Sequence, residues 1–120
     1  MKSKYDKTNI FSKILRYEIS CEKVLENEHA LAFLDINPQA PTHILIIPKN
    51  DYIDLYDFTE KSSSQEITYF WKLVNDVINN RNISDSGFRI ITNSGKDGNQ
   101  DVQHFHVHLL GGQNLGKMVN

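Results

Sequence analysis

Three histidines at alternate positions are the part of the sequence that most clearly indicates chemistry. His104, His106 and His108 are three of only five histidines in the 120 residues. Because side chains alternate faces along a β-strand, this spacing puts the three rings on one face, with neighbouring rings roughly 7 Å apart. The intervening residues are apolar β-formers suited to a core. The sequence therefore predicts a strand with a histidine face that Gly111-Gly112 ends.

Three interpretations of that face are possible. The simplest is a solvated face that happens to use histidine, but strict alternation beside an apolar counter-face disfavours it. Imidazoles at positions i and i+2 of a strand can also chelate zinc. In the third interpretation one ring is a nucleophile and its neighbours donate hydrogen bonds to a charged substrate. The spacing alone leaves the last two open.

Composition and charge are those of an ordinary globular domain. The chain is 39% hydrophobic and 23% charged, which fits one domain over residues 1–120. A net charge of −2 argues against a surface that coats nucleic acid. Cys21 is alone, and the sequence shows neither a membrane-length apolar run nor a signal-peptide core. We expect a cytoplasmic protein with no nucleic-acid partner and no membrane partner.

The helices and strands that must position the histidines are predicted from hydrophobic periodicity, helix-capping residues and turn residues. Asn9 is a candidate N-cap for a short helix over 10–15, and Ser63 with Glu66 resembles a capping box before a long amphipathic helix ending near 79–82. The segment 49–64 is polar with turn signals, and the termini at 1–8 and 113–120 are tails. Strands are predicted over 22–25, 29–34, 42–47 and 88–92, followed by the histidine strand that ends at Gly111-Gly112. The expected fold class is α+β, a five-stranded antiparallel sheet with one long and one short helix.

Two further features could serve an anionic ligand. The loop from Gly95 to Asp101 leads directly onto the histidine strand, and Gly95 and Gly98 allow consecutive N–H groups to form an anion-binding concavity. Asp35 follows a predicted strand, where a carboxylate can accept both hydroxyls of a ribose. Each signal is weak alone and gains weight beside the histidines.

The stretch from His104 to Gly112 resembles the signature of the histidine triad family, His-x-His-x-His followed by two apolar residues. Further resemblance covers most of the chain. Residues 10–15 look like the N-terminal helix of the Hint branch, and 33–43 like its most recognisable loop. Residues 92–100 are similar to its phosphate loop, and 115–118 to a bacterial C-terminal end.

This resemblance implies a homodimer with one continuous sheet, and a site that binds a purine nucleotide, an AMP or GMP derivative, and cleaves at its α-phosphorus. By analogy His106 attacks phosphorus and forms a nucleotidyl-histidine intermediate, while His104 and His108 orient and polarise the centre. The expected substrate-binding residues are Asp35 for the ribose, Phe11, Ile14 and Ile36 for the base, and Asn93 with the backbone of Asn99, Gln100 and Asp101 for the phosphoryl oxygens.

The sequence also departs from this family pattern. Many bacterial relatives form a structural zinc site from a Cys-x-x-Cys pair and two histidines, and here Asn9 and Ser12 stand at the cysteine positions and Asp51 at one histidine position. We therefore expect no metal, and no cofactor is implied. Asp101 stands where the Hint branch usually has a serine near the leaving group.

The function predicted from the sequence is hydrolysis of nucleoside 5′-phosphoramidates of the AMP–amine or acyl-AMP type. One alternative is dinucleoside polyphosphate hydrolysis, although Gly111-Gly112 after the triad favours the Hint branch. The alternative from another class is a nucleotide-binding interaction protein with weak catalysis.

Overall fold

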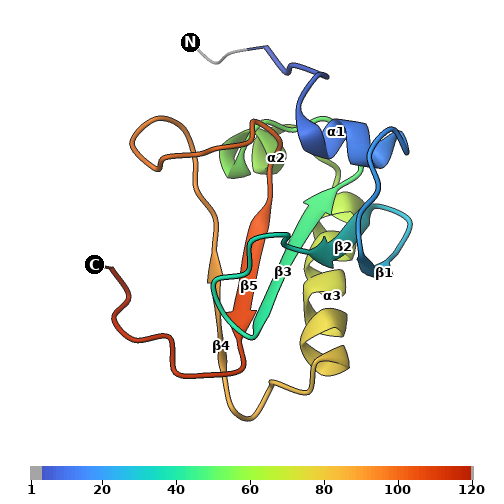
Figure 1. Ribbon diagram of the computed structural model, residues 1–120. Helices are drawn as coiled ribbons and strands as arrows, with labels where there is room; N and C mark the ends of the chain where they lie inside the picture. The colour runs from blue at the N-terminus through green and yellow to red at the C-terminus, as the bar shows by residue number, and fades with distance from the viewer. Residues whose placement is uncertain (1–3, 120) are drawn as a thin grey trace.

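In the computed structural model, which describes residues 4–119, five strands and three helices follow one another along the chain (Figure 1). The elements are α1 (Ile10–Leu15), β1 (Lys23–Glu26), β2 (Ala30–Leu34), β3 (Thr42–Pro48), α2 (Leu55–Lys61), α3 (Ser64–Asn80), β4 (Phe88–Ile91) and β5 (Val107–Gly111).

All five strands belong to one antiparallel sheet in the order β1-β2-β3-β5-β4. This confirms the predicted α+β class. The central strand β3 pairs with β5 in a register that sets Leu45 opposite His108. Strands β1 and β4 form the two edges, so the histidine strand lies inside the sheet and its position is fixed from both sides.

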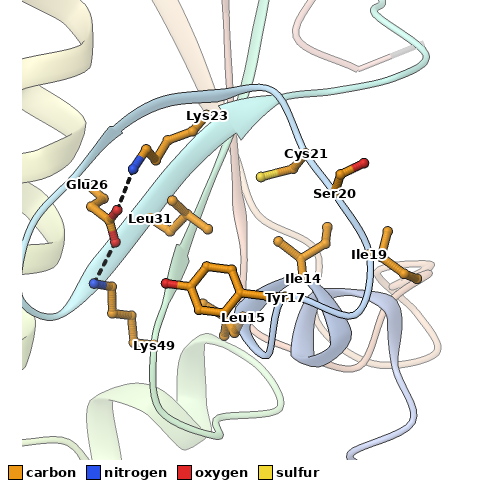
Figure 2. Close-up of a pocket in the computed structure, with 10 residues that line it drawn as sticks. All are labelled: Ile14, Leu15, Tyr17, Ile19, Ser20, Cys21, Lys23, Glu26, Leu31 and Lys49. Carbon is orange, nitrogen blue, oxygen red and sulfur yellow. Dashed lines mark hydrogen bonds and ion pairs between the residues drawn. The ribbon is translucent and has the colours of Figure 1, made fainter.

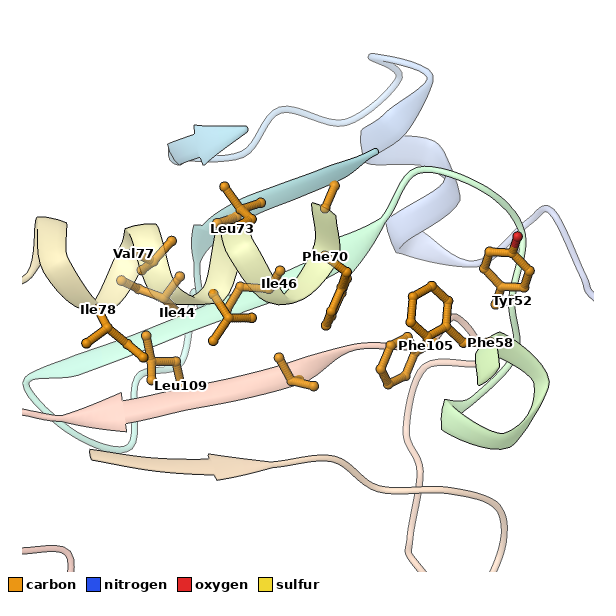
Figure 3. Close-up of a cluster of buried hydrophobic side chains, with 14 of the residues drawn as sticks. Ile44, Ile46, Tyr52, Phe58, Phe70, Leu73, Val77, Ile78, Phe105 and Leu109 are labelled. Carbon is orange, nitrogen blue, oxygen red and sulfur yellow. The ribbon is translucent and has the colours of Figure 1, made fainter. Parts of the chain in front are cut away.

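The long helix α3 covers one face of the sheet (Figure 3). Its start is the capping box that the sequence predicts, with the Ser63 hydroxyl accepting from the Glu66 N–H and the Glu66 carboxylate accepting from the Ser63 N–H. Its apolar stripe packs on the inward side chains of β3 and β5. The fully or nearly fully buried members of this cluster include Phe70, Leu73, Val77, Ile44, Ile46, Phe105 and Leu109.

The short helix α1 lies on the opposite face of the sheet. Asn9 caps it as predicted, accepting the Ser12 N–H at 2.9 Å. Phe11 and Ile14 are buried in a second, smaller cluster with four side chains of β2 and β3, namely Leu31, Phe33, Leu45 and Ile47. Helix α1 thus covers part of the sheet face that carries the histidines. A cavity remains between this helix and the sheet.

The histidine strand begins later than the spacing predicts. Only Val107–Gly111 is in the ladder, so His104 and His106 precede β5. Their backbone groups bond elsewhere: Phe105 N–H donates to the Tyr52 carbonyl at 2.7 Å, and Thr92 Oγ1 donates to the His106 carbonyl at 2.7 Å. The side chains before β5 still alternate between the two faces. His104 and His106 contact Phe11 on one face, and Phe105 stacks on Phe58 on the other.

The polar segment 49–64 contains a helix that the sequence analysis did not predict. Asp54 caps α2 by accepting the Asp57 N–H at 2.8 Å, and Phe58 inserts fully into the core. Seven residues are too short to show helical periodicity, and this helix is held by one buried aromatic side chain rather than by an apolar stripe. No helix among residues 4–119 has the length and apolar character needed to cross a membrane.

The two termini are more tightly held than the term tail suggests. Before α1, the Tyr5 hydroxyl hydrogen-bonds to His104, and the Asp6 carboxylate accepts the N–H of Thr8 at 2.9 Å. At the other end Arg89 on β4 donates to the carbonyls of Gly116 and Lys117. The predicted tails also include residues 1–3 and residue 120, which lie outside the described residues.

Candidate active site

A cavity of about 320 Å³ lies between α1 and the sheet, and it gathers most of the predicted site residues. His106, His108 and Asp101 line one part of it. The remaining wall is largely apolar, with Asp35 at its margin. Seven of the eleven predicted site residues therefore meet in one space: Phe11, Ile14, Asp35, Ile36, Asp101, His106 and His108.

His106 is held as a single tautomer with a free lone pair. Its Nδ1 lies 2.8 Å from the backbone carbonyl oxygen of His104, and because a carbonyl can only accept, Nδ1 carries the proton. In the neutral ring Nε2 is then unprotonated. The ring is almost fully buried, packs edge-on against Phe11 and borders the cavity. Nε2 is therefore available as a nucleophile.

His104 lies behind the cavity rather than in its wall. Its ring is fully buried, and Nε2 donates to the Pro48 carbonyl oxygen at 2.9 Å. Burial lowers the pKa of His104 to about 4, so the ring is neutral near pH 7. With Nε2 protonated, Nδ1 accepts a hydrogen bond, and the Tyr5 hydroxyl is its partner. The backbone carbonyl of His104, rather than its ring, contacts the His106 ring.

His108 is oriented by a residue that the sequence analysis did not select, His43 on β3. The Gln39 N–H donates to His43 Nδ1 at 3.0 Å, so the His43 proton is on Nε2. That atom lies 2.9 Å from His108 Nδ1, which must accept. His108, whose pKa burial lowers to about 4, is therefore neutral with its proton on Nε2. Sequence does hold a signal, since His43 is an isolated histidine within the apolar strand 42–47.

Asp35 adjoins this histidine pair. Its Oδ2 lies 3.3 Å from His43 Nε2, and its Oδ1 accepts the Asn37 N–H at 2.8 Å. Burial lowers the pKa of His43 while the Asp35 charge opposes that shift. Ligand atoms of Asp35, His43 and His108 all lie within 4.8 Å, close enough for a metal ion. The direct contact between the two imidazoles instead needs a proton between them, which a metal ion would have to displace.

Asp101 is the acidic residue that lies beside His106 Nε2. Its Oδ1 lies 3.6 Å from His106 Nε2, and the same oxygen accepts the Val102 N–H at 2.8 Å. The side chain is largely exposed, so it stands at the mouth of the cavity. A departing group that becomes cationic or takes up a proton would meet a carboxylate here.

The side chain of Gln100 holds the loop before the histidines through hydrogen bonds to backbone groups. Gln100 Oε1 accepts the Gly95 N–H at 3.0 Å, and Nε2 donates to the carbonyls of Ile53 and Val102. Two predicted phosphate donors are also used inside the loop, because Asn99 N–H donates to Lys96 and Gln100 N–H to Gly95. Among those three amides only that of Asp101 is unpaired within residues 4–119. Gly98 is required, since a Cβ there would lie 2.5 Å from the Ser94 carbonyl oxygen.

Asn93 opens this loop two residues after β4, and it does not line the cavity. Its predicted contact with a phosphoryl oxygen stays a prediction. Asn99 is separated from the cavity in the same way and adopts a positive φ of 55° that serves the turn.

A second cavity of about 460 Å³ lies beside the first, on the side of β1 (Figure 2). The two share Ile14, Ile19, Ser20 and Cys21 as a wall. Its charged groups already pair with one another, because Lys23 and Lys49 each lie 2.7 Å from Glu26. No described histidine lines it. Although larger, it lacks the groups for phosphoryl chemistry.

Asn9, Ser12 and Asp51, the three departures from the family pattern, have other contacts here. Asn9 caps α1, and Ser12 Oγ accepts from Arg16 at 2.8 Å. Asp51 lies 3.5 Å from Lys7 Nζ in an ion pair.

The chain was compared with known families and proteins. The HIT domain profile matches residues 16–115. A 13.2 kDa HIT-like protein of Azospirillum brasilense is 50% identical over 119 residues, covering 99% of this chain and 98% of that protein. The purine nucleoside phosphoramidase of Escherichia coli (strain K12) is 41% identical over 110 residues, covering 92% of each chain.

Solved structures agree with these sequence matches. A HIT family hydrolase from Clostridium thermocellum superposes with a TM-score of 0.86 at 36% identity, covering 95% of this chain and 98% of that one. A histidine triad protein from Clostridium difficile gives a TM-score of 0.82 at 37% identity, covering 98% of each chain.

Proposed function

This chain belongs to the HIT domain family, and we propose on that premise that it is a purine nucleotide hydrolase that cleaves nucleoside 5′-phosphoramidates at the α-phosphorus. The observation that carries the proposal is the His106 ring, whose proton is fixed on Nδ1 by the His104 carbonyl. This leaves the Nε2 lone pair at the cavity wall.

In the proposed reaction the His106 Nε2 lone pair forms a bond to phosphorus, and the phosphorus–nitrogen bond breaks. Its electron pair leaves with the amine, which takes up a proton from the solvent, and the water that attacks in the next step returns one proton to the solvent. Water then attacks the phosphorus of the nucleotidyl-histidine, and the histidine leaves with its lone pair restored. A covalent intermediate divides one difficult displacement into two easier ones, and a neutral imidazole is a good nucleophile near neutral pH.

The neighbouring groups match the charges of this reaction. The His108 ring borders the cavity and has its proton on Nε2, which suits donation to a phosphoryl oxygen. The Asp101 N–H is a second candidate donor. Asp101 Oδ1, 3.6 Å from His106 Nε2, suits a leaving amine that gains a proton and repels an anionic polyphosphate. The phosphoramidate class is therefore favoured over dinucleoside polyphosphates.

The rest of the cavity suits a nucleoside. Phe11, Ile14 and Ile36 offer apolar surface to a purine base, and Asp35 is the acid placed to accept the ribose hydroxyls. The Asp35 carboxylate already accepts the Asn37 N–H through Oδ1, which fixes its orientation. The E. coli relative, a purine nucleoside phosphoramidase by name, supports the same choice of base.

We also propose that two copies join their sheets along β4. This edge strand exposes Phe88 at 42%, Ile90 at 37% and Ile91 at 37% of their surfaces. An edge with unpaired backbone groups and exposed apolar side chains is a ready partner for a second strand. Antiparallel pairing of two β4 strands would make one continuous ten-stranded sheet, twice the five strands of one chain.

The test uses the purified protein with an adenosine 5′-phosphoramidate of a primary amine. We expect turnover by the wild type and a loss of several orders of magnitude in kcat for His106→Ala, with AMP affinity changed only a few-fold. His29→Ala is the matched control, because His29 lies outside the cavity and packs on Tyr69. Near-normal turnover in His106→Ala would remove His106 from its role. Tight AMP binding without any turnover by the wild type would instead support an interaction protein.

A further inference from the structure

The segment before α1 contributes a side chain to the histidine cluster. Tyr5 crosses from the N-terminal side to His104, 99 positions along the chain, and its hydroxyl hydrogen-bonds to His104 Nδ1. The two rings also meet edge to face, with centroids 5.6 Å apart. Because His104 is fully buried, water cannot replace this partner without opening the structure.

The direction of this hydrogen bond follows from its neighbours. Asn9 Oδ1 accepts the Ser12 N–H at the start of α1, so the other end of that amide, Nδ2, is the donor that lies 3.0 Å from the Tyr5 hydroxyl oxygen. The Tyr5 oxygen accepts from Asn9, which directs its own proton to His104 Nδ1. His104 Nε2–H meanwhile donates to the Pro48 carbonyl. Both nitrogens of the buried ring are thus satisfied.

The position of His104 matters because its backbone carbonyl is the group that orients the nucleophile. That oxygen accepts the His106 Nδ1–H at 2.8 Å. The ring of His104 is attached to the same residue and is anchored on its two sides by Tyr5 and Pro48. Removing one anchor leaves an unpaired buried nitrogen, and the residue can then relieve that cost only by moving or by admitting water.

We propose that Tyr5 is a positioning residue for the reaction: its hydroxyl, aligned by the N-cap residue Asn9, holds His104 so that the His104 carbonyl keeps His106 Nε2 directed at the substrate. The inference rests on the proposed role of His106 as nucleophile. It makes the N-terminal segment part of the catalytic apparatus without any contact between that segment and the substrate.

The variant that tests this is Tyr5→Phe, which retains the ring and removes the hydroxyl. We expect kcat to fall roughly 10-fold to 100-fold with KM little changed, since small displacements of a reacting group slow chemistry more than binding. Tyr52→Phe is the matched control. It removes a phenol hydroxyl from a buried ring, but that hydroxyl donates to Glu66 at 2.7 Å and not to a histidine. Its kcat should stay within about twofold of the wild type.

A second variant and a second measurement make the result independent of folding and of the substrate. Asn9→Ser keeps an N-cap side chain but removes the donor to Tyr5, and it should lower kcat in the same direction by a smaller factor. The proton NMR signal of His106 Nδ1–H reports the contact with the His104 carbonyl without any turnover. We expect that signal to shift or broaden in Tyr5→Phe and to stay in place in Tyr52→Phe.

These outcomes separate the two proposals. If the wild type turns over no phosphoramidate, the proposed function fails, and the His106 signal still tests the role of Tyr5. A wild-type kcat and an unmoved His106 signal in Tyr5→Phe overturn the inference. So does an equal loss of kcat in Tyr5→Phe and Tyr52→Phe, because that result would reflect stability alone.

Discussion

His43 Nε2 lies 2.9 Å from His108 Nδ1, although 65 positions separate the two residues along the chain. The contact is made because β3 and β5 are neighbours in the sheet. His43 is itself oriented by a backbone group, the Gln39 N–H, so a fixed chain of donors runs from the loop before β3 to the cavity. The proton on His108 Nε2, which we propose as a donor to the substrate, is therefore positioned by a loop outside the histidine signature.

The first prediction is that His43→Ala lowers kcat for a phosphoramidate roughly 10-fold to 100-fold and leaves AMP affinity nearly unchanged. Without the His43 donor, the His108 proton can lie on either ring nitrogen, and the donor facing the cavity is lost part of the time. Steady-state kinetics and calorimetric titration with AMP check this. A kcat equal to that of the His29→Ala control would show that His108 needs no such support.

The second prediction concerns the leaving group. Asp101→Ser should raise kcat/KM for dinucleoside polyphosphates relative to phosphoramidates of basic amines, because it removes a carboxylate 3.6 Å from the His106 nitrogen. The measurement is the ratio of the two kcat/KM values in wild type and variant. Asp97→Ser, an exposed acid of the same loop, is the control and should leave the ratio unchanged. A shift toward phosphoramidates in Asp101→Ser would mean that the carboxylate does not act on the leaving group.

The third prediction is that Ile90→Glu converts a dimer to a monomer, because a carboxylate would have to be buried where two β4 edges meet. Size-exclusion chromatography with light scattering measures the mass directly. Tyr17→Glu is the control, since Tyr17 is 92% exposed and lies near the opposite edge of the sheet. A monomeric wild type, or a dimer that Ile90→Glu leaves intact, would place the contact elsewhere or remove it.

The fourth prediction is a loss of stability on acidification. Burial lowers the pKa of both His104 and His108 from the usual 6.5 to about 4, so the folded state binds fewer protons than the unfolded state between those values. The resulting stability is fully present above pH 6.5 and is lost as the pH falls toward 4. The fully buried His104 alone accounts for roughly 3 kcal/mol. Urea unfolding at a series of pH values should show this slope.

His104→Gln supplies the comparison for that slope. It removes one titrating group, so its free energy of unfolding should depend on pH less steeply than that of the wild type, by up to one proton. Parallel curves for the two proteins would show that His104 does not stay neutral in the fold.

Much of the fold could be predicted from local pattern. Local sequence patterns predicted the Asn9 cap, the capping box at Ser63 and Glu66, and the five strands. Each of these features depends on the types of a few neighbouring residues. Helix α2 could not be predicted in that way. Its anchor, Phe58, is buried only because Phe70 and Phe105 reach it from distant parts of the chain.

The sequence by itself determined that the histidines share one side of the chain, opposite the apolar side chains between them. A period of two sets His104 and His106 opposite Phe105 whether or not the ladder extends that far, since extended backbone alone alternates its side chains. Tertiary structure decided which ring nitrogens of His104 and His108 carry protons. A tautomer depends on the partner of each nitrogen, and Tyr5, Pro48 and His43 come from 99, 56 and 65 positions away. No local pattern contains those distances, so only the folded chain sets the tautomers of His104 and His108, whereas His106 takes its tautomer from the His104 carbonyl two positions away.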